Sequence, residues 1–499
     1  MKSENALSRL FAGLTGKKAP SLSDKDRLAA LIGTDPSAFA AFERAYQTAV
    51  LDADPGQGVF DTNSRQASAQ TRAIDPENLP RVTEQDIAAA KAMAETIAAS
   101  LAAETPVYVF DGYTERLPDA PDFTRPMLPA PTGITNKDIT ALHPAVRPQL
   151  TDMLMKRDIN ANTGIELLSL YGESMNPDVP AKRRQLAYHQ FRQGLDILDL
   201  DGLTYAMLGM NQNAMSHWLP ALVKANQNKD FFKIPATKIA RVPITLLQLS
   251  RTDYELLTQT SKNIVDLWAM KVFGLDENKS YFIKTGTYSS KFDFRNVKVT
   301  TPKEVRELGE YLLYIQYQTG MMAGPLTQPS VYGASTTNEW VVREFIEDKE
   351  NNPTIYKGLP LHTEYRVFID CDKKLVLGIT PYWEPETMKK HFAHKPDADS
   401  PHQVHDYVVY KSHEHVLMNR YNNNKADVMQ AVTELLPDLE LTGQWSLDIM
   451  QNGEDFWLID MALAETSAFY ADCVPETLRR PTKENWLPRL PETAEKESV

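Results

Sequence analysis

Cysteine is scarce in this sequence of 499 residues, which contains only Cys371 and Cys473. Neither a disulfide framework nor a cysteine-rich zinc site is therefore expected. Long apolar runs are also missing, because none approaches the roughly 18 to 20 residues that a membrane-spanning helix needs. The apolar stretch within residues 1–20 is too short for a secretory signal peptide. We therefore expect a soluble, cytoplasmic protein.

Positive charge is in deficit as well, since the formal net charge is -13. Nucleic acid and anionic membranes are accordingly poor candidates as partners, although a local basic groove is compatible with this total. Several nucleotide-binding signatures are absent: there is no G-x-x-x-x-G-K-[ST] loop, no dinucleotide-type G-x-G-x-x-G and no set of protein-kinase motifs. Any nucleotide chemistry must then use another fold.

The first half of the chain has a helical texture. Residues 83–104 are rich in alanine, follow a helical pattern and open on a Thr-x-x-Asp capping box. A second capping box, formed by Thr252 and Glu255, predicts the start of another helix. A chain of this length should hold two or three domains. We expect the first, residues 1–240, to be mainly helical.

From Tyr281 onward the texture changes to short runs rich in β-branched and aromatic residues. One helix interrupts them with Thr301 as N-cap and Gly320 as its stop, and "KADVMQAVTELL" is a second. The expected strands are "EWVVREFI", "TEYRVFID", "KLVLGIT", "DYVVY", "QWSLDIM" and "DFWLID".

These patterns predict an α+β fold. A domain rich in antiparallel sheet is expected over residues 241–473, after the helical region 1–240. A proline-rich tail, residues 474–499, is expected to be extended.

Two lysines flank a loop of small residues in "YFIKTGTYSSKFDF". Lys284 ends an apolar strand, and Lys291 follows seven residues later. Gly286, Ser289 and Ser290 allow close approach, so the loop can present N–H and hydroxyl donors to an anion. A hairpin would bring both ammonium groups to one phosphate, with the loop as a movable flap. By itself, Lys284 is equally explained by a strand-end lysine that reaches solvent.

Acidic and basic residues on later strands supply what a triphosphate with Mg²⁺ would require. Glu364 and Arg366 lie two residues apart and so share one face of a strand, where a plain ion pair is the simpler reading. Asp448 and Asp460 interrupt apolar runs in a hairpin and are expected to pair across it. Two buried carboxylates side by side are costly unless a cation neutralises them.

In their order, these parts resemble the ATP-grasp superfamily, in which two α+β subdomains with antiparallel sheets clamp ATP. Within it, the series is most similar to the cell-division-cycle-123-like branch, the assembly factor of eukaryotic initiation factor two. The likeness rests on "KTGTYSSK", "TEYRVFID" and the later "LID", and covers about residues 240–470. The helical first half matches no family that we can name.

The resemblance implies roles for individual residues. Lys284 and Lys291 would contact the ATP phosphates, and Arg366 would face the γ-phosphate or an acyl phosphate. Asp448 and Asp460 would hold Mg²⁺. The backbone at the end of the strand "EWVVREFI", at Glu344, Phe345 and Ile346, would meet the adenine, with Arg343 nearby.

One departure from the family pattern concerns the metal. The family usually has an asparagine two residues after the second acid, whereas Ala462 stands here, and Glu465 would have to supply the missing ligand. The implied reaction is that of an ATP-dependent ligase, in which a small-molecule or peptide carboxylate becomes an acyl phosphate and is captured by an amine. Lys291 and Arg366 would stabilise charge in that step.

Two alternatives remain open. The first is an ATP-binding assembly factor without ligase activity, which would hold a protein partner through residues 1–240. The second is a nucleotidyl-transferring nucleic-acid ligase, although Lys284 is followed by Thr285 and Gly286 rather than by the x-Asp-Gly of that class. The histidine-rich segment His391–His415 invites a zinc reading, but its prolines and lack of periodicity favour a mobile polar insertion.

Overall fold

The structure is a computed structural model. It describes residues 81–150 apart from 104, 122 and 124–133, scattered residues between 170 and 209, and residues 211–480 apart from 251, 253, 323–335 and 393–401. Most of the expected helical region 1–240 and of the tail 474–499 therefore lies outside the described residues. In the described part of the chain, no helix combines the length and apolarity that a membrane span requires.

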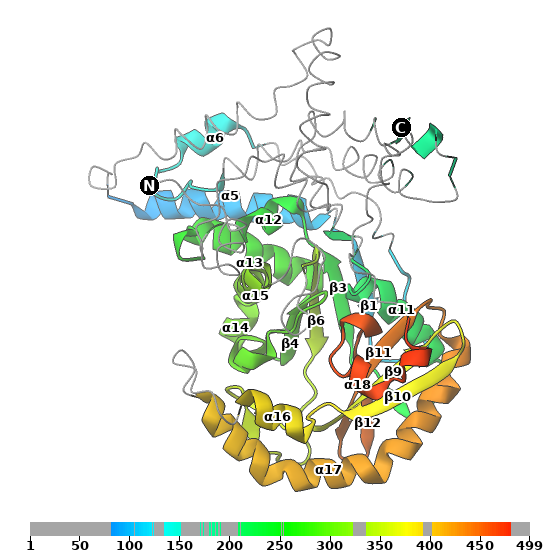
Figure 1. The fold of residues 1–499 in the computed structure, drawn as a ribbon. Coiled ribbons are helices and arrows are strands. Elements are labelled where there is room, and N and C mark those ends of the chain that lie inside the picture. The colour runs from blue at the N-terminus through cyan, green and yellow to red at the C-terminus, as the bar shows by residue number, and fades with distance from the viewer. Residues whose placement is uncertain are drawn as a thin grey trace, which may run out of the picture.

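A first sheet of five antiparallel strands runs in the order β1-β3-β6-β4-β5 (Figure 1). Its central position is taken by β6, the predicted strand "EWVVRE", which pairs with the lysine-bearing strand β4. The strands are β1 (Val107–Phe110), β3 (Thr237–Arg241), β6 (Glu339–Glu344), β4 (Tyr281–Thr285) and β5 (Lys298–Val299).

A second sheet has the order β10-β9-β11-β12-β2, antiparallel except for the last pair. A separate two-stranded ribbon joins β7 (Thr354–Ile355) to β8 (Leu359–Pro360). The five strands are β10 (Leu375–Pro381), β9 (Thr363–Asp370), β11 (Gln444–Asn452), β12 (Asp455–Leu463) and β2 (Phe232–Lys233). The content is thus mixed α and β with antiparallel sheets, as predicted.

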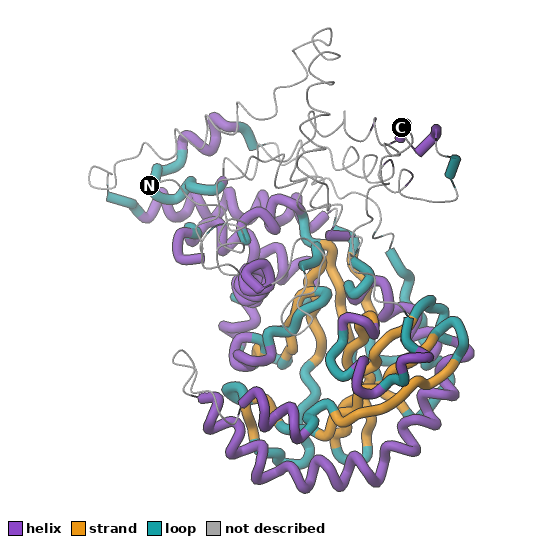
Figure 2. Tube along the Cα trace, viewed as in Figure 1, coloured by secondary structure: helices purple, strands orange, loops and turns teal. Residues whose placement is uncertain are grey.

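Helices cover one face of the first sheet and close a core against it (Figures 1 and 2). Ile283 of β4 and Trp340 of β6 are fully buried there, and Trp340 contacts Trp268 edge to face at 5.5 Å. The helices in this layer are α5 (Glu84–Ala103), α12 (Ile244–Leu249), α13 (Gln259–Phe273), α14 (Pro302–Arg306) and α15 (Leu308–Met322). A short helix, α6 (Asn136–Ala141), contributes Ile139 to the same core.

A second core lies against the other sheet. It is closed by α11 (Met215–Ala225) and by the last turns of α17 (His402–Leu435), a long helix that curves along the lower edge of the view in Figure 1. Ile239 and Val341 of the first sheet also reach into this core. The first sheet is therefore packed on both faces. Further helices are α16 (Pro385–Phe392) and α18 (Tyr470–Cys473). Short 3-10 helices lie at Tyr254–Leu256, Lys291–Asn296, Leu436–Asp438, Ala464–Thr466 and Glu476–Leu478.

Strands from before residue 241 belong to both sheets. β1 and β3 pair within the first sheet, and β2 pairs with β12 in the second. The region that we expected to be a helical unit of its own therefore contributes strands as well as helices. Because strand pairing joins residues far apart in sequence, composition along the chain did not reveal that these strands pair with later ones.

Three local predictions were wrong. The run "DYVVY" is not a strand but part of α17, in which Tyr410 and Leu417 are buried one heptad apart. The helical period of buried residues along α17 outweighs the strand preference of five residues. Helix α13 begins after Thr258, whose side chain accepts a hydrogen bond from the Ser261 N–H, and not after Thr252. Gly320 does not stop α15, which continues to Met322.

Several sequence signals were confirmed. The Thr301 capping box is formed as predicted, with Glu304 reaching back to the backbone N–H of Thr301. The helix opened by the Thr83 box runs over Glu84–Ala103. The remaining predicted strands occur as β6, β9, β10, β11 and β12.

Gly309 lets two helices of the first core cross at close range. A Cβ atom at this position would lie 2.5 Å from the carbonyl oxygen of Val265 and 2.8 Å from the Cα atom of Asp266 on α13. We expect Gly309→Ala to lower the free energy of unfolding by about 1–3 kcal/mol, because backbone cannot yield as a side chain can. Gly320 of the same helix has open space around its Cβ direction. Gly320→Ala should be neutral or gain up to about 1 kcal/mol, and urea unfolding of both variants tests the contrast.

Candidate functional site

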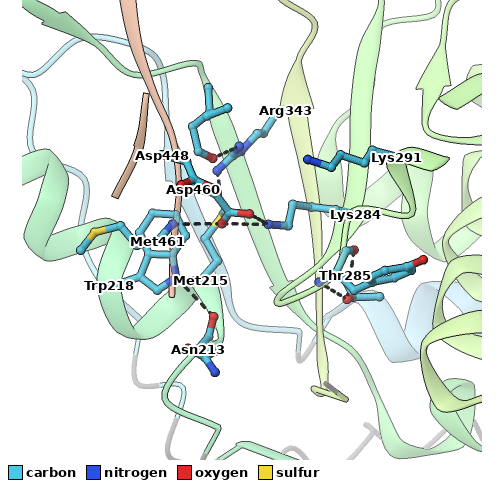
Figure 3. A network of polar contacts seen from close by, with 12 residues as sticks. Asn213, Met215, Trp218, Lys284, Thr285, Lys291, Arg343, Asp448, Asp460 and Met461 are labelled. Carbon is cyan, nitrogen blue, oxygen red and sulfur yellow. Dashed lines mark hydrogen bonds and ion pairs between the residues drawn. The ribbon is translucent and has the colours of Figure 1, made fainter. Parts of the chain in front are cut away.

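Charged side chains from both sheets gather where the sheets face one another, and we call this place the inter-sheet site (Figure 3). Strand alternation decides which residues of the first sheet reach it. Lys284 pairs in register with Val341, which faces the second core, so Lys284 points away from the helical layer. Arg343 lies two residues after Val341 on the same face. The members of the site are Lys284, Lys291, Arg343, Glu364, Arg366, Asp448 and Asp460.

The second sheet contributes a row of side chains across adjacent strands. Arg366 on β9 lies opposite Asp448 on β11, and Asp448 lies opposite Asp460 on β12. The alternate residues of β9 and β11 are apolar and face the second core. The predicted pairing of the two aspartates across the hairpin is confirmed.

A β-bulge is what places Asp460 in this row. Phe456 and Leu458 of β12 pack against the second core, so strict alternation would send Asp460 into that core too. The register shifts between Asp448 and Ile449, which leaves Ile459 as an extra residue on β12. After the extra residue, Met461 faces the core and Asp460 faces the site.

Lys284 and Asp460 form an ion pair that links the two sheets. The Lys284 Nζ atom lies 3.0 Å and 2.9 Å from the two carboxylate oxygens of Asp460. Lys284 is 1% exposed, whereas the Asp460 side chain is 37% exposed. Burial lowers the pKa of Lys284, and Asp460 is the main group that opposes this shift. The carboxylate is thus the accessible member of the pair.

Arg366 and Asp448 form a second, bidentate pair within the second sheet. Arg366 Nε and Nη2 donate to the two oxygens of Asp448 at 2.8 Å and 2.7 Å. The two side chains are 12% and 11% exposed. Burial disfavours the charged guanidinium, but Asp448 more than offsets this and raises the pKa of Arg366. Such a fork-to-carboxylate arrangement fixes both groups in position.

Arg343 is the second cation that the first sheet contributes. It is 6% exposed, and its Nη1 atom donates to the carbonyl oxygen of Ile459, which the bulge makes available. Burial lowers the pKa of Arg343 to about 10, against the influence of Asp460. Arg343 was expected near the adenine, but its side chain points into the inter-sheet site beside Asp460 (Figure 3).

Lys291 is the first residue of the 3-10 helix Lys291–Asn296, and its side chain contacts two aromatic residues in the site. Its Nζ atom donates to the Tyr382 hydroxyl and lies 3.8 Å and 5.2 Å from the ring centroids of Tyr382 and Trp383. Burial acts to lower the pKa of Lys291, but Tyr382 and the Glu364 carboxylate raise it overall. Figure 3 shows the ammonium groups of Lys284 and Lys291 pointing to the same side. The two ammonium groups therefore face the same side, while their meeting at one phosphate stays a prediction.

Tyr382 was not found by sequence reasoning. It follows β10 directly, its N–H donates to the Glu364 carbonyl, and its ring also lies 4.7 Å from the Arg366 guanidinium carbon. The dipeptide Tyr382-Trp383 after a predicted strand was the only signal, and it is not distinctive.

Glu364 lies two residues before Arg366 on the same face, as predicted, and is 8% exposed. Burial raises the pKa of its carboxyl to about 7, since desolvation outweighs the nearby Lys291. The folded protein therefore binds a proton that the unfolded chain releases above its ordinary pKa of 4.5. The stability that this proton contributes is complete below pH 4.5 and is lost as the pH rises through 7.

We expect wild type to lose about 3 kcal/mol of unfolding free energy, relative to Glu364→Gln, between pH 4.5 and pH 8. The amide cannot ionise, so it does not share this loss. Urea unfolding of both proteins across this range measures the difference. Parallel pH profiles for the two proteins would contradict the prediction.

The loop between the two lysines is tied down, which differs from the free flap that we expected. The Gly286 N–H donates to the Glu339 carbonyl, and the Gly286 carbonyl accepts from the Met215 N–H. A Cβ on Gly286 would lie 2.9 Å from a carboxylate oxygen of Glu339 and 3.0 Å from a methyl carbon of Thr337, so a larger residue would require these side chains to shift. The Ser290 hydroxyl donates to Gln318 at 2.8 Å, while Ser289 is half-buried. Small residues therefore serve close packing at this point.

The expected adenine hinge follows β6. The N–H groups of Glu344 and Phe345 already donate to the carbonyls of Ala236 and Ser280. Phe345 packs against the first core, with the Lys298 Nζ atom 3.9 Å from its ring centroid. A contact with an adenine edge would thus fall to the carbonyl groups of this segment or to Ile346.

The proposed metal ligands are two rather than three. Among the described residues, no group of three or more His, Cys, Asp or Glu side chains is placed to hold a metal ion. Glu465 lies in the one-turn 3-10 helix Ala464–Thr466 after β12, where its charge helps to raise the pKa of Tyr470. It does not join Asp448 and Asp460 in such a group.

The histidine-rich segment was expected to be a mobile insertion, but much of it belongs to helix α17. The histidines on α17 are His402, His405, His413 and His415, while His394 lies outside the described residues.

A segment to which sequence reasoning assigned no role contacts both sheets beside the site. Asn213 accepts a hydrogen bond from the Leu463 N–H at the end of β12, and Met215 binds Gly286 beside β4. Arg343 Nη2 lies 3.4 Å from the Met215 sulfur. Residues 213–215 therefore connect both sheets next to the inter-sheet site (Figure 3).

Comparisons with known proteins complete the description. No protein-family model matches the chain, and no curated protein sequence matches it significantly. The chain is similar to C-terminally truncated Cdc123 from Schizosaccharomyces pombe at 14% identity and a TM-score of 0.31, over 54% of this chain and 93% of that one. It is also similar to Cdc123 from Schizosaccharomyces pombe at 14% identity and a TM-score of 0.28, over 51% and 83% of the two chains.

Proposed function

We propose that the inter-sheet site binds a nucleoside triphosphate together with Mg²⁺. The observation that carries this proposal is the pairing of strand-borne cations with strand-borne carboxylates at one place, Lys284 with Asp460 and Arg366 with Asp448. Lysine and arginine are the side chains that bind phosphate oxygens, and carboxylates are the hard ligands that Mg²⁺ prefers. ATP is the nucleotide proposed because the sequence order resembles the ATP-grasp superfamily.

The donor set fits Mg²⁺. Asp448 and Asp460 lie opposite one another on adjacent strands, and one of them is partly exposed. Mg²⁺ is commonly held by one or two carboxylates, with water and phosphate oxygens completing its shell. When bound, the metal would neutralise phosphate charge. Lys284 and Lys291 would bind and orient the phosphate oxygens, and Arg366 would do so from the second sheet.

The proposal is for ATP binding. The ligase reaction, with an acyl phosphate formed from a carboxylate substrate, and the role of an ATP-binding assembly factor without turnover both require this site. The described contacts concern charge neutralisation and positioning, so binding is the function that they support best. An assay with radiolabelled ATP separates the outcomes: ADP release indicates the ligase, tight binding without release the assembly factor, and a labelled protein adduct nucleotidyl transfer.

Calorimetric titration of the full chain tests the binding itself. With Mg²⁺ present, ATP should bind at least about tenfold more tightly than AMP, because each charge-assisted contact to the β- and γ-phosphates contributes about 1.5–3 kcal/mol. AMP serves as the control that shares the base and ribose. Equal affinity for ATP and AMP, or no binding of either, would overturn the proposal.

A further inference from the structure

The inter-sheet site already contains two ion pairs between its own cations and carboxylates. Lys284 is bound by both oxygens of Asp460, and both oxygens of Asp448 are bound by the Arg366 guanidinium. Two of the three proposed phosphate-binding cations, Lys284 and Arg366, are thus held by the two proposed metal-binding carboxylates, whereas Lys291 is held by Tyr382. Because of these pairs, the binding of a metal ion and the binding of a polyphosphate affect one another.

A polyphosphate that arrives alone can engage Lys284 or Arg366 fully only by drawing that cation away from its carboxylate. That leaves Asp460 or Asp448 beside the incoming negative charge without a counter-ion, and Asp448 is only 8% exposed. A metal ion that arrives alone meets the opposite difficulty, because at Asp460 it either lies against the ammonium group of Lys284, which is 1% exposed, or displaces that group. A buried charge without a partner is strongly disfavoured in either case.

Metal and polyphosphate together remove the difficulty. The carboxylates released by the cations gain the metal, and the cations released by the carboxylates gain the phosphate. This inference rests on the function proposed above. We infer that the inter-sheet site exchanges its own ion pairs for contacts with a metal ion and a polyphosphate. It therefore binds the two ligands jointly and binds each of them alone only weakly. Lys284 and Asp460 are the positioning pair that enforces this coupling across the two sheets.

The wild-type chain provides the first test, with inorganic triphosphate as a probe that lacks the base. Titrations are made with Mg²⁺ alone, with triphosphate in EDTA, and with triphosphate in excess Mg²⁺. The joint affinity should exceed that of metal-free triphosphate by about tenfold or more, the usual size of a coupling between two ligands. Equal affinity with and without Mg²⁺ would overturn the inference. It would leave triphosphate binding, and hence the proposed function, intact.

Asp460→Asn gives the sharper test, because it removes a metal ligand and yet should improve binding of metal-free triphosphate. The substitution releases Lys284 without changing the size of its partner. We expect the metal-free affinity to rise about tenfold, while the gain from Mg²⁺ largely disappears. The titrations are made near pH 6.5, since burial lowers the pKa of Lys284 and its main opposing group is then missing.

A double-mutant cycle separates pair exchange from a general effect of net charge. In a Lys284→Met background, Asp460→Asn has no cation to release and should give little gain in triphosphate affinity. An effect of net charge would give the same gain in both backgrounds, and that result would overturn the inference. Lys284→Met alone should strengthen binding of Mg²⁺ in the absence of phosphate, because Asp460 is then unpaired.

A matched control comes from an exposed pair, in which Lys224 lies 2.7 Å from Glu440. Glu440→Gln changes the net charge by the same amount as Asp460→Asn and should alter none of the affinities. Melting temperatures of all variants are measured first. If Asp460→Asn does not fold, the wild-type titrations and the Mg²⁺ titration of Lys284→Met still decide the matter.

Discussion

Replacing Arg366 by methionine is expected to lower the free energy of unfolding by about 3–5 kcal/mol, the usual cost of leaving one member of a buried ion pair without its partner. Asp448 loses both hydrogen bonds of the bidentate pair and, at 8% exposure, cannot regain them from water. Methionine keeps much of the side-chain volume, so the loss reports charge rather than a cavity. Urea unfolding followed by circular dichroism measures it.

Two companion variants make this prediction specific. Arg366→Met combined with Asp448→Leu should recover most of the lost stability, because replacing both partners by apolar groups leaves no charge unpaired. Arg306→Met breaks an exposed pair with Glu277 and should cost no more than about 1 kcal/mol. If Arg366→Met costs no more than Arg306→Met, the pair is not a structural part of the second sheet.

Removing both lysines of the inter-sheet site should have the largest effect on ligand binding. Lys284→Met/Lys291→Met is expected to weaken binding of ATP in the presence of Mg²⁺ by about a thousandfold, since each charge-assisted contact contributes about 1.5–3 kcal/mol. The lysines come from opposite ends of one loop and point to the same side (Figure 3). Calorimetric titration, extended to millimolar ATP, covers the expected range.

The control for this variant is another pair of lysines with the same change in net charge. Lys224 and Lys411 are exposed and form ion pairs with Glu440 and Glu414, away from the inter-sheet site. Lys224→Met/Lys411→Met should bind ATP as wild type does. A comparable loss of affinity in both double variants would show that overall charge, and not the two site lysines, governs binding.

Stretches with strong local signals were predictable from the sequence. The strand "TEYRVFID" occurs as β9 with the predicted bounds, because Tyr365, Val367 and Ile369 alternate with other residues at the period of a strand. The Thr301 capping box formed for an equally local reason, since its partners are three residues apart. Where the local signal was short, as in "DYVVY", the packing of a 34-residue helix overruled it.

The candidate site was predictable in most of its charged members but not in its connections. The spacing of Glu364 and Arg366 places them on one face, and the hairpin brings Asp448 opposite Asp460. That Lys284 is bound by Asp460 depends on contact between strands 176 residues apart, for which a single sequence carries no signal. The part played by Tyr382 was missed for the same reason.

By itself, the sequence determined the chemistry that this protein brings together: lysines at a small-residue loop, an acid and an arginine on one strand, and two aspartates in a hairpin. Only the tertiary structure decided how these groups are used. The bulge at Ile459 turns Asp460 from the core toward the site, and the approach of the two sheets then gives it Lys284 as a partner. Periodicity along a strand predicts a face, but an extra residue and a second sheet determine what that face meets.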